Sequence, residues 1–176
     1  MPTGRGGEAS DILDRLLAAH EAYFDVERDY ELGGVMFDGF AQLHASSSQY
    51  VLVKRAKLWE TSSHEYLFLK IVDTLGTQVL DELVEFMRTR ALDVVELDQN
   101  HMNSFLTLVI IANDVQPGLE RAIEGTRFRK NFLFGLRGWS DLRVCVIDRA
   151  QCRIVTNRMG RELVPTLEAN AFIGPA

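Results

Sequence analysis

The chain has 176 residues and a formal net charge of −6, and hydrophobic and charged residues make up 47% and 25% of it. This ordinary globular composition excludes a wholly disordered chain. The sequence has no apolar run near the ~20 residues of a membrane-spanning helix, and Met1–Glu8 lacks the apolar stretch of a secretory signal. We therefore expect one α+β domain over residues 10–176 after a flexible tail at residues 1–9, in the cytoplasm of a bacterial cell.

The first half of the chain predicts one helix followed by three strands. Apolar residues at helical spacing indicate a helix from Ser10 to about Tyr23. The acidic stretch from Glu21 to Glu31 reads as a connection that Gly33 and Gly34 end. Alternating apolar residues, separated by short polar turns, then predict an antiparallel meander. Its strands are expected at 35–44, 50–59 and 64–73.

The second half predicts three more helices and four more strands. Helical spacing indicates helices over 77–91, 117–125 and 165–172, and strands are expected over 105–111, 128–136, 142–147 and 152–156. The strand at 128–136 would place its phenylalanines on a core face, and the chain would turn at Gly138–Asp141. The expected fold is one mixed, largely antiparallel sheet with helices packed on it. The element order is α-β-β-β-α-β-α-β-β-β-α.

Charge is distributed unevenly along the chain. Residues 121–161 hold ten basic and three acidic side chains, whereas residues 1–120 hold nine basic and 20 acidic ones. The basic segment therefore carries +7 and the part before it −11. An asymmetry of this size indicates an anionic partner or a contact between oppositely charged surfaces.

The order α-β-β-β-α-β over roughly the first 125 residues resembles the core of restriction-endonuclease-like nucleases. This resemblance implies a divalent metal held by acids, with a lysine that helps to activate water. Asp38, Glu65 and Asp73 are the candidate acids, and His64 is either a general base beside Glu65 or a turn residue. The family's acid-x-Lys triplet is missing at all four lysines, Lys54, Lys57, Lys70 and Lys130.

Other patterns that bind cofactors or metals do not occur in the chain. The sequence contains neither a Gly-x-Gly-x-x-Gly nor a Walker A loop, and its histidines lack metal-site spacing. We therefore expect no cofactor and no metal. Asn113 and Asp114, after a buried strand, either contact a ligand at the strand end or cap the next helix. Cys145 and Cys152 are expected to be buried free thiols, as in a reducing compartment.

The segment from Thr126 to Arg143 combines basic and aromatic residues. Basic groups bind phosphates and exposed aromatic rings stack on bases, so nucleic-acid binding is one interpretation. A sheet edge with a solvated basic face is another. A third is contact with the acidic stretch of the same chain or of a second subunit. The candidate binding residues are Arg129, Lys130, Arg137, Trp139 and Arg143.

These patterns favour a non-catalytic binding domain over an enzyme. The expected partner is anionic, either nucleic acid or an acidic protein surface, and a homodimer is the other expectation. We expect no membrane contact. The alternative hypothesis is a divergent metal-dependent nuclease or hydrolase that uses the three acids and His64.

Overall fold

The computed structural model describes residues 8–43, 63–97 and 103–173. Its helices are α1 (Ala9–His20), α3 (Thr77–Arg88), α4 (Glu120–Gly125) and α5 (Val164–Ala171), with short 3-10 turns η1 (Arg90–Val94), η2 (Leu133–Gly135) and η3 (Arg158–Leu163). Its strands are β1 (Asp25–Leu32), β2 (Val35–Leu43), β3 (Ser63–Leu75), β4 (Asn103–Val115), β5 (Arg129–Asn131), β6 (Trp139–Asp148) and β7 (Arg153–Thr156).

One mixed sheet of seven strands organises the molecule, in the order β1-β2-β3-β4-β6-β5, and β7 also pairs with β6. The central pairs β3–β4 and β4–β6 are parallel, and the other four pairs are antiparallel. Long apolar runs form the central strands because both of their faces are covered. The largely antiparallel α+β sheet expected from the sequence is confirmed.

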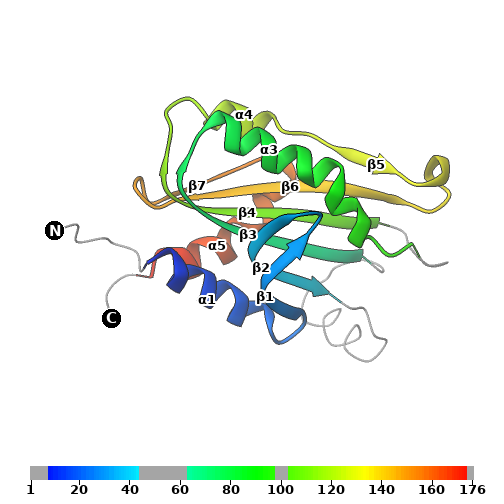
Figure 1. Cartoon of the computed structure of the whole chain (residues 1–176), viewed down its shortest axis with the longest axis horizontal. Helices are drawn as coiled ribbons and strands as arrows, with labels where there is room; N and C mark the ends of the chain where they lie inside the picture. The colour runs from blue at the N-terminus through cyan, green and yellow to red at the C-terminus, as the bar shows by residue number, and fades with distance from the viewer. Residues whose placement is uncertain (1–7, 44–62, 98–102, 174–176) are drawn as a thin grey trace.

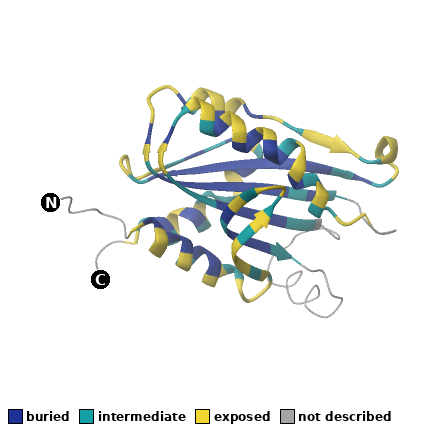
Figure 2. Ribbon diagram, in the orientation of Figure 1, coloured by how far each residue is buried: buried dark blue, intermediate teal, exposed yellow. Residues whose placement is uncertain are grey.

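Helices cover both faces of the sheet (Figure 1). α3 and α4 lie on one face, over a core that includes Tyr66, Phe68 and Leu108. α1 and α5 lie on the other face, over a second core that includes Leu69 and Val109. The buried residues of the central strands therefore separate two apolar layers (Figure 2). Within the described ranges, no helix is both long enough and apolar enough to cross a membrane.

The first strand of the sheet is the acidic stretch that the sequence pattern left as a connection. β1 pairs with β2 across a turn at Gly33 and Gly34, whose φ angles of 58° and 81° suit a tight hairpin. The strand's exposed side chains are mostly acidic, because β1 forms the outer edge of the sheet. The order of helices and strands thus agrees with the expected order, with β1 as its first strand. The strand expected at 50–59 lies outside the described residues.

The strand expected over 128–136 differs most from the structure. β5 ends at Asn131, and the chain then enters the 3-10 turn η2 instead of continuing the alternation. β6 begins at Trp139, inside the segment that was expected to be a turn. Phe134 and Leu136, expected on a core face, are among the most exposed residues of the protein. Two glycines, Gly135 and Gly138, permit this early turn with φ angles of 89° and 74°.

Candidate functional site

A hairpin projects from one end of the molecule, beyond the helices (Figure 1). β5 and the start of β6 form its two antiparallel strands, with Arg129 opposite Asp141 and Asn131 opposite Trp139. We call the connecting residues Phe132–Gly138 the hairpin tip. The tip lies at the edge of the sheet opposite to β1, since β6 and β5 end the strand order.

Backbone hydrogen bonds close the hairpin tip into a compact turn. The Phe132 N–H donates to the Gly138 carbonyl (3.0 Å), and the Phe132 carbonyl accepts from Gly135 (2.9 Å) and Arg137 (3.2 Å). Leu133 and Phe134 have φ angles of 46° and 56°, in the left-handed region. This region costs an L-residue roughly 1–2 kcal/mol, so the tip holds two strained residues in a defined shape.

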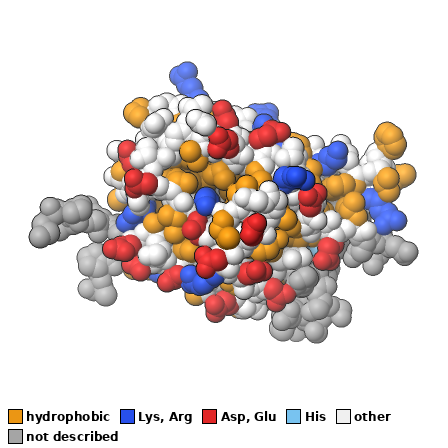
Figure 3. Space-filling view, viewed as in Figure 1, with side chains coloured by type: hydrophobic (Ala, Val, Ile, Leu, Met, Phe, Trp, Pro, Cys, Tyr) orange, Lys and Arg blue, Asp and Glu red, His pale blue; other side chains and the backbone are white. Residues whose placement is uncertain are grey.

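The hairpin tip presents large apolar side chains to solvent. Phe134 is 104% exposed, Leu136 87% and Leu133 61%. Figure 2 shows this end as exposed, and Figure 3 shows hydrophobic side chains gathered there beside basic ones. Scattered exposed apolar residues are ordinary, but three within four positions of one turn form a patch.

Basic side chains precede this patch along the hairpin and also lie within its tip. Arg127 and Lys130 are exposed, and neither forms an ion pair with a described residue. Arg137 is half-buried, and its guanidinium donates to the Leu97 carbonyl at 3.3 Å. The patch therefore combines an apolar centre with a basic rim, an arrangement typical of docking surfaces.

Arg129 and Trp139 form hydrogen bonds within the hairpin. The Nε and Nη2 atoms of Arg129 donate to the two carboxylate oxygens of Asp141, at 2.7 and 2.8 Å. The Trp139 indole N–H donates to the same carboxylate at 3.1 Å, and the guanidinium of Arg129 lies 5.1 Å from the Trp139 ring. The hydrogen bonds to Asp141 raise the pKa of Arg129. The charge of Arg129 and the polar edge of the indole are thus satisfied within the protein.

Arg143 does not lie on the surface where the sequence pattern placed it. It is 5% exposed, and its guanidinium donates to Glu65 at 2.8 Å and to Glu162 at 3.2 Å. β6 is paired on both sides, with β4 and with β5 and β7, and this arginine points between the layers instead of into solvent. Of the five candidate binding residues, only Lys130 remains an exposed cation without an ion pair to a described residue.

The candidate catalytic acids lie apart. Glu65 and Asp73 are both on β3, eight residues or about 26 Å apart along the strand, so they cannot share one ion. Asp38, on β2, accepts from the Ile71 N–H at 2.7 Å, and Asp73 accepts from Asn113 at 2.9 Å. Among the described residues, no three His, Cys, Asp or Glu side chains are placed to hold a metal.

His64 lies within β3, directly before Glu65, with which an acid–base pair was one of two interpretations. Successive residues of a strand point to opposite faces of the sheet, so the His64 ring and the Glu65 carboxylate diverge. Glu65 is instead engaged by Arg143, at 2.8 Å. The three acids and His64 therefore do not assemble into one site.

The strand end at Asn113 carries a polar network. The Asn113 amide donates to Asp73 at 2.9 Å and accepts from Arg149. These three residues follow one another across β3, β4 and the end of β6. Asp114 is exposed beside them, and the helix α4 begins only at Glu120. Asn113 thus links neighbouring strand ends, whereas the capping role considered for it is wrong because Leu119 precedes the helix.

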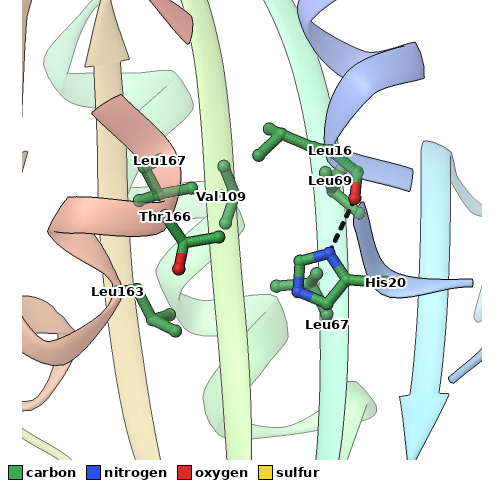
Figure 4. Close-up of a pocket in the computed structure, with 8 residues that line it drawn as sticks. All are labelled: Leu16, His20, Leu67, Leu69, Val109, Leu163, Thr166 and Leu167. Atoms are coloured by element: carbon green, nitrogen blue, oxygen red, sulfur yellow. Dashed lines mark hydrogen bonds between the residues drawn. The ribbon is translucent and has the colours of Figure 1, made fainter. Parts of the chain in front are cut away.

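A second feature is a small hollow between α1 and α5 (Figure 4). Leu67, Leu69 and Val109 form its floor, and its volume is about 260 Å³ including the open space above it. The His20 Nδ1 donates to the Leu16 carbonyl at 2.7 Å. The space enclosed within it is only about 10 Å³, far below the ~300–1,000 Å³ of ordinary ligand pockets.

The acidic and basic parts of the chain lie at opposite edges of the sheet, which bears on the interpretation that they contact one another within one molecule. The acidic stretch forms β1 at one edge, while the basic hairpin lies at the opposite edge. With strands ~4.8 Å apart, the two edges are about 24 Å from one another. The basic segment therefore does not face the acidic stretch of its own chain.

The apolar tip itself was not recognised in the sequence. The signal that could have found it is the pair of glycines in Leu133-Phe-Gly-Leu-Arg-Gly138, because each glycine permits a turn that an alternating strand does not need. A large apolar run broken by glycines after a short strand is typical of a hairpin end.

Comparison of the chain with curated proteins and with solved structures finds no match. A family model does match, over residues 8–169, which spans every strand of the sheet, α1, α3 and α4, and most of α5. The family is described as Domain of unknown function (DUF8052), and the chain belongs to this family.

Proposed function

We propose that this protein is a non-catalytic binding domain that docks its hairpin tip onto an acidic surface of a protein partner. The observation that carries the proposal is Phe134, which is 104% exposed at the end of a hydrogen-bonded turn. A rigid, exposed aromatic side chain loses little conformational freedom on binding and is a frequent anchor of interfaces.

The hairpin tip gains free energy only when something covers it. Burying a Phe or Leu side chain contributes about 1.5–3 kcal/mol, and this contribution is missing while Phe134 and Leu136 face water. The left-handed backbone at Leu133 and Phe134 adds strain. A partner that buries these side chains would offset both costs.

The basic rim selects the sign of the partner's charge. Lys130 lies in β5, two residues before the tip, and Arg127 precedes the strand; neither is neutralised by a described acid. Exposed charges of this kind steer association and exclude partners of like charge more than they add affinity. Docking should therefore favour an acidic surface and weaken as salt rises.

A protein surface fits the tip better than nucleic acid does. The aromatic residue suited to base stacking, Trp139, is held within the hairpin by Asp141, and Arg129 is neutralised by the same carboxylate. Arg143 is buried. What remains exposed is a mainly aliphatic and phenyl surface with few cations to bind phosphates.

Site-specific photo-crosslinking tests this proposal. A photoreactive phenylalanine replaces Phe134 in one sample and Ile173, another exposed apolar residue (54%), in a matched control. After irradiation in a lysate of the source cells at low salt, mass spectrometry identifies each crosslinked segment. We expect acidic protein segments attached at position 134 and none of them attached at position 173.

Charge-reversal variants make the test specific. Lys130→Glu in the crosslinking background should reduce the adduct several-fold, whereas Arg121→Glu, an exposed change on α4, should leave it unchanged. Adducts with nucleic acid, the same adducts from both positions, or no adduct at position 134 would overturn the proposal.

A further inference from the structure

The edge of the sheet opposite to the hairpin tip carries the complementary charge. We call β1 together with Met36 the acidic edge. Its exposed acids are Asp25, Glu27, Asp29 and Glu31. Only Arg28 is basic in this strand, and Asp14 of α1 binds it at 2.6 Å. β1 is the outermost strand of the sheet, and no other strand of the described residues pairs with its outer side.

Apolar surface accompanies these acids. Met36 lies opposite Glu31 in the β1–β2 register and is 45% exposed. Tyr30 and Leu32 point to the other face of the strand, where Tyr30 stacks on Phe40 with the ring centroids 4.1 Å apart. Methionine adapts its shape to a neighbouring side chain, so Met36 suits the reception of an aromatic anchor.

The two surfaces cannot meet within one molecule. They lie at opposite edges of the sheet, about 24 Å apart by strand spacing, which exceeds the ~8 Å over which exposed charges interact at physiological salt. Their complementarity is therefore available only between molecules.

We infer that the partner of the hairpin tip is the acidic edge of a second copy of this chain, an inference that rests on the proposed function. Phe134 of one protomer packs beside Met36 of the other, and Lys130 faces Glu31, which lies opposite Met36 in the β1–β2 register. Two acidic edges repel one another, as do two basic tips. The attractive combination is thus head to tail.

A head-to-tail contact leaves one tip and one edge unused in every dimer. Such a heterologous interface adds further protomers until a ring closes or a filament grows. The mass of the assembly should therefore rise with concentration from that of the 19.9 kDa monomer, without stopping at two chains.

Two variants that each disable one surface test this arrangement. The tip variant is Phe134→Ser with Leu136→Ser, and the edge variant is Glu27→Lys with Glu31→Lys. All four positions are exposed, so both variants should keep the fold. Sedimentation velocity at low salt should show that each variant alone is a monomer.

The mixture of the two variants is the decisive sample. In this mixture the edge variant supplies an unmodified hairpin tip, and the tip variant supplies an unmodified acidic edge. We expect the equimolar mixture to form a heterodimer of twice 19.9 kDa and nothing larger, whereas the unmodified chain continues to larger species. Added salt should dissociate the heterodimer.

Other results would overturn the inference. They are a monomeric unmodified chain at all concentrations, a mixture that stays monomeric, or variants that still associate by themselves. If photo-crosslinking at Phe134 attaches acidic segments of other proteins while these samples stay monomeric, the proposed function stands and the second copy is not the partner. If position 134 gives no adduct either, both fail.

Discussion

The guanidinium of Arg143 lies 3.6 Å from the centroid of the Phe105 ring. The two residues sit on adjacent central strands, and their side chains share the face of the sheet that also carries Glu65. Arg143 is thereby held between an aromatic ring and two carboxylates, those of Glu65 and Glu162. The most basic stretch of the sequence thus supplies a structural ion pair at its centre.

Removing this arginine should destabilise the protein strongly. Arg143→Ala leaves the partly buried Glu65 carboxylate without its cation and uncovers Phe105. We expect a loss of about 2–4 kcal/mol in the free energy of unfolding, measured by urea denaturation. Glu162→Gln should cost less than Glu65→Gln, because the Glu162 side chain is 51% exposed and that of Glu65 only 23%. Equal costs for Arg143→Ala and the exposed control Arg127→Ala would contradict this account.

Asn157 is a second buried polar residue whose loss should be severe. Its side-chain oxygen accepts from Val144 (3.1 Å) and Gly160 (3.0 Å), and its amide donates to the Thr126 (3.1 Å) and Leu142 (2.9 Å) carbonyls. Asn157→Ala removes the side-chain partner of the Val144 N–H and of the Thr126 and Leu142 carbonyls, at about 2–4 kcal/mol, whereas the Gly160 N–H keeps its bond to the Asn157 backbone carbonyl at 3.1 Å. Urea denaturation with circular dichroism measures the loss.

The variant Asn157→Asp distinguishes hydrogen bonding from packing at this position. A carboxylate keeps both acceptor contacts but faces two carbonyl oxygens with no proton to donate. Protonation at low pH restores one donor. We therefore expect the deficit of Asn157→Asp relative to the unmodified chain to shrink as pH falls, whereas that of Asn157→Ala should not follow this pattern.

Cys145 should make stability fall at alkaline pH. Burial raises the pKa of its thiol from 9.0 to about 12 in the folded state. Above pH 9 the thiol of the unfolded chain ionises while the buried Cys145 thiol stays protonated, which favours unfolding. The contribution of Cys145 to stability is therefore fully present below pH 9 and is lost as pH rises from 9 toward 12. Between pH 9 and 10.5 the loss should be about 1–2 kcal/mol.

Matched cysteine variants check this pH dependence. Cys145→Ala should show a shallower fall of the unfolding free energy over the same range, and Cys152→Ala should not, because Cys152 is exposed. In the folded protein, iodoacetamide should modify Cys152 first and reach Cys145 only after unfolding. Prompt modification of both thiols would show that Cys145 is not enclosed.

Polar substitution at the hairpin tip should stabilise the fold while weakening docking. Phe134 has a φ of 56°, a conformation that asparagine adopts at lower cost, so Phe134→Asn should raise the unfolding free energy by up to about 1 kcal/mol. Leu136, with a φ of −67°, provides the control, and Leu136→Asn should leave stability unchanged. A loss of stability with Phe134→Asn would mean that the phenyl ring packs within its own chain.

Much of the fold was predictable because its signals are local. Apolar residues at helical spacing gave α1 and α3, and dense apolar runs gave β3 and β4. β1 was not predicted because an edge strand contains few apolar residues. Among the described strands, only β2 pairs with it. Cys152 was expected to be buried but lies exposed in the β6–β7 turn, with a φ of 48°.

The exposed surface of the hairpin tip depends on contacts between residues that lie far apart in the sequence. The sequence by itself determined the helices, the central strands and the separation of a basic segment from acidic ones. Only the tertiary structure decided which charges face solvent, because the parallel register of β3, β4 and β6 brings Glu65 and Phe105 to Arg143 and buries it. The antiparallel pairing of β5 with β6 ends at Asn131, and Phe134 in the tip beyond it is exposed. Local periodicity specifies elements, whereas burial is set by which strands become neighbours.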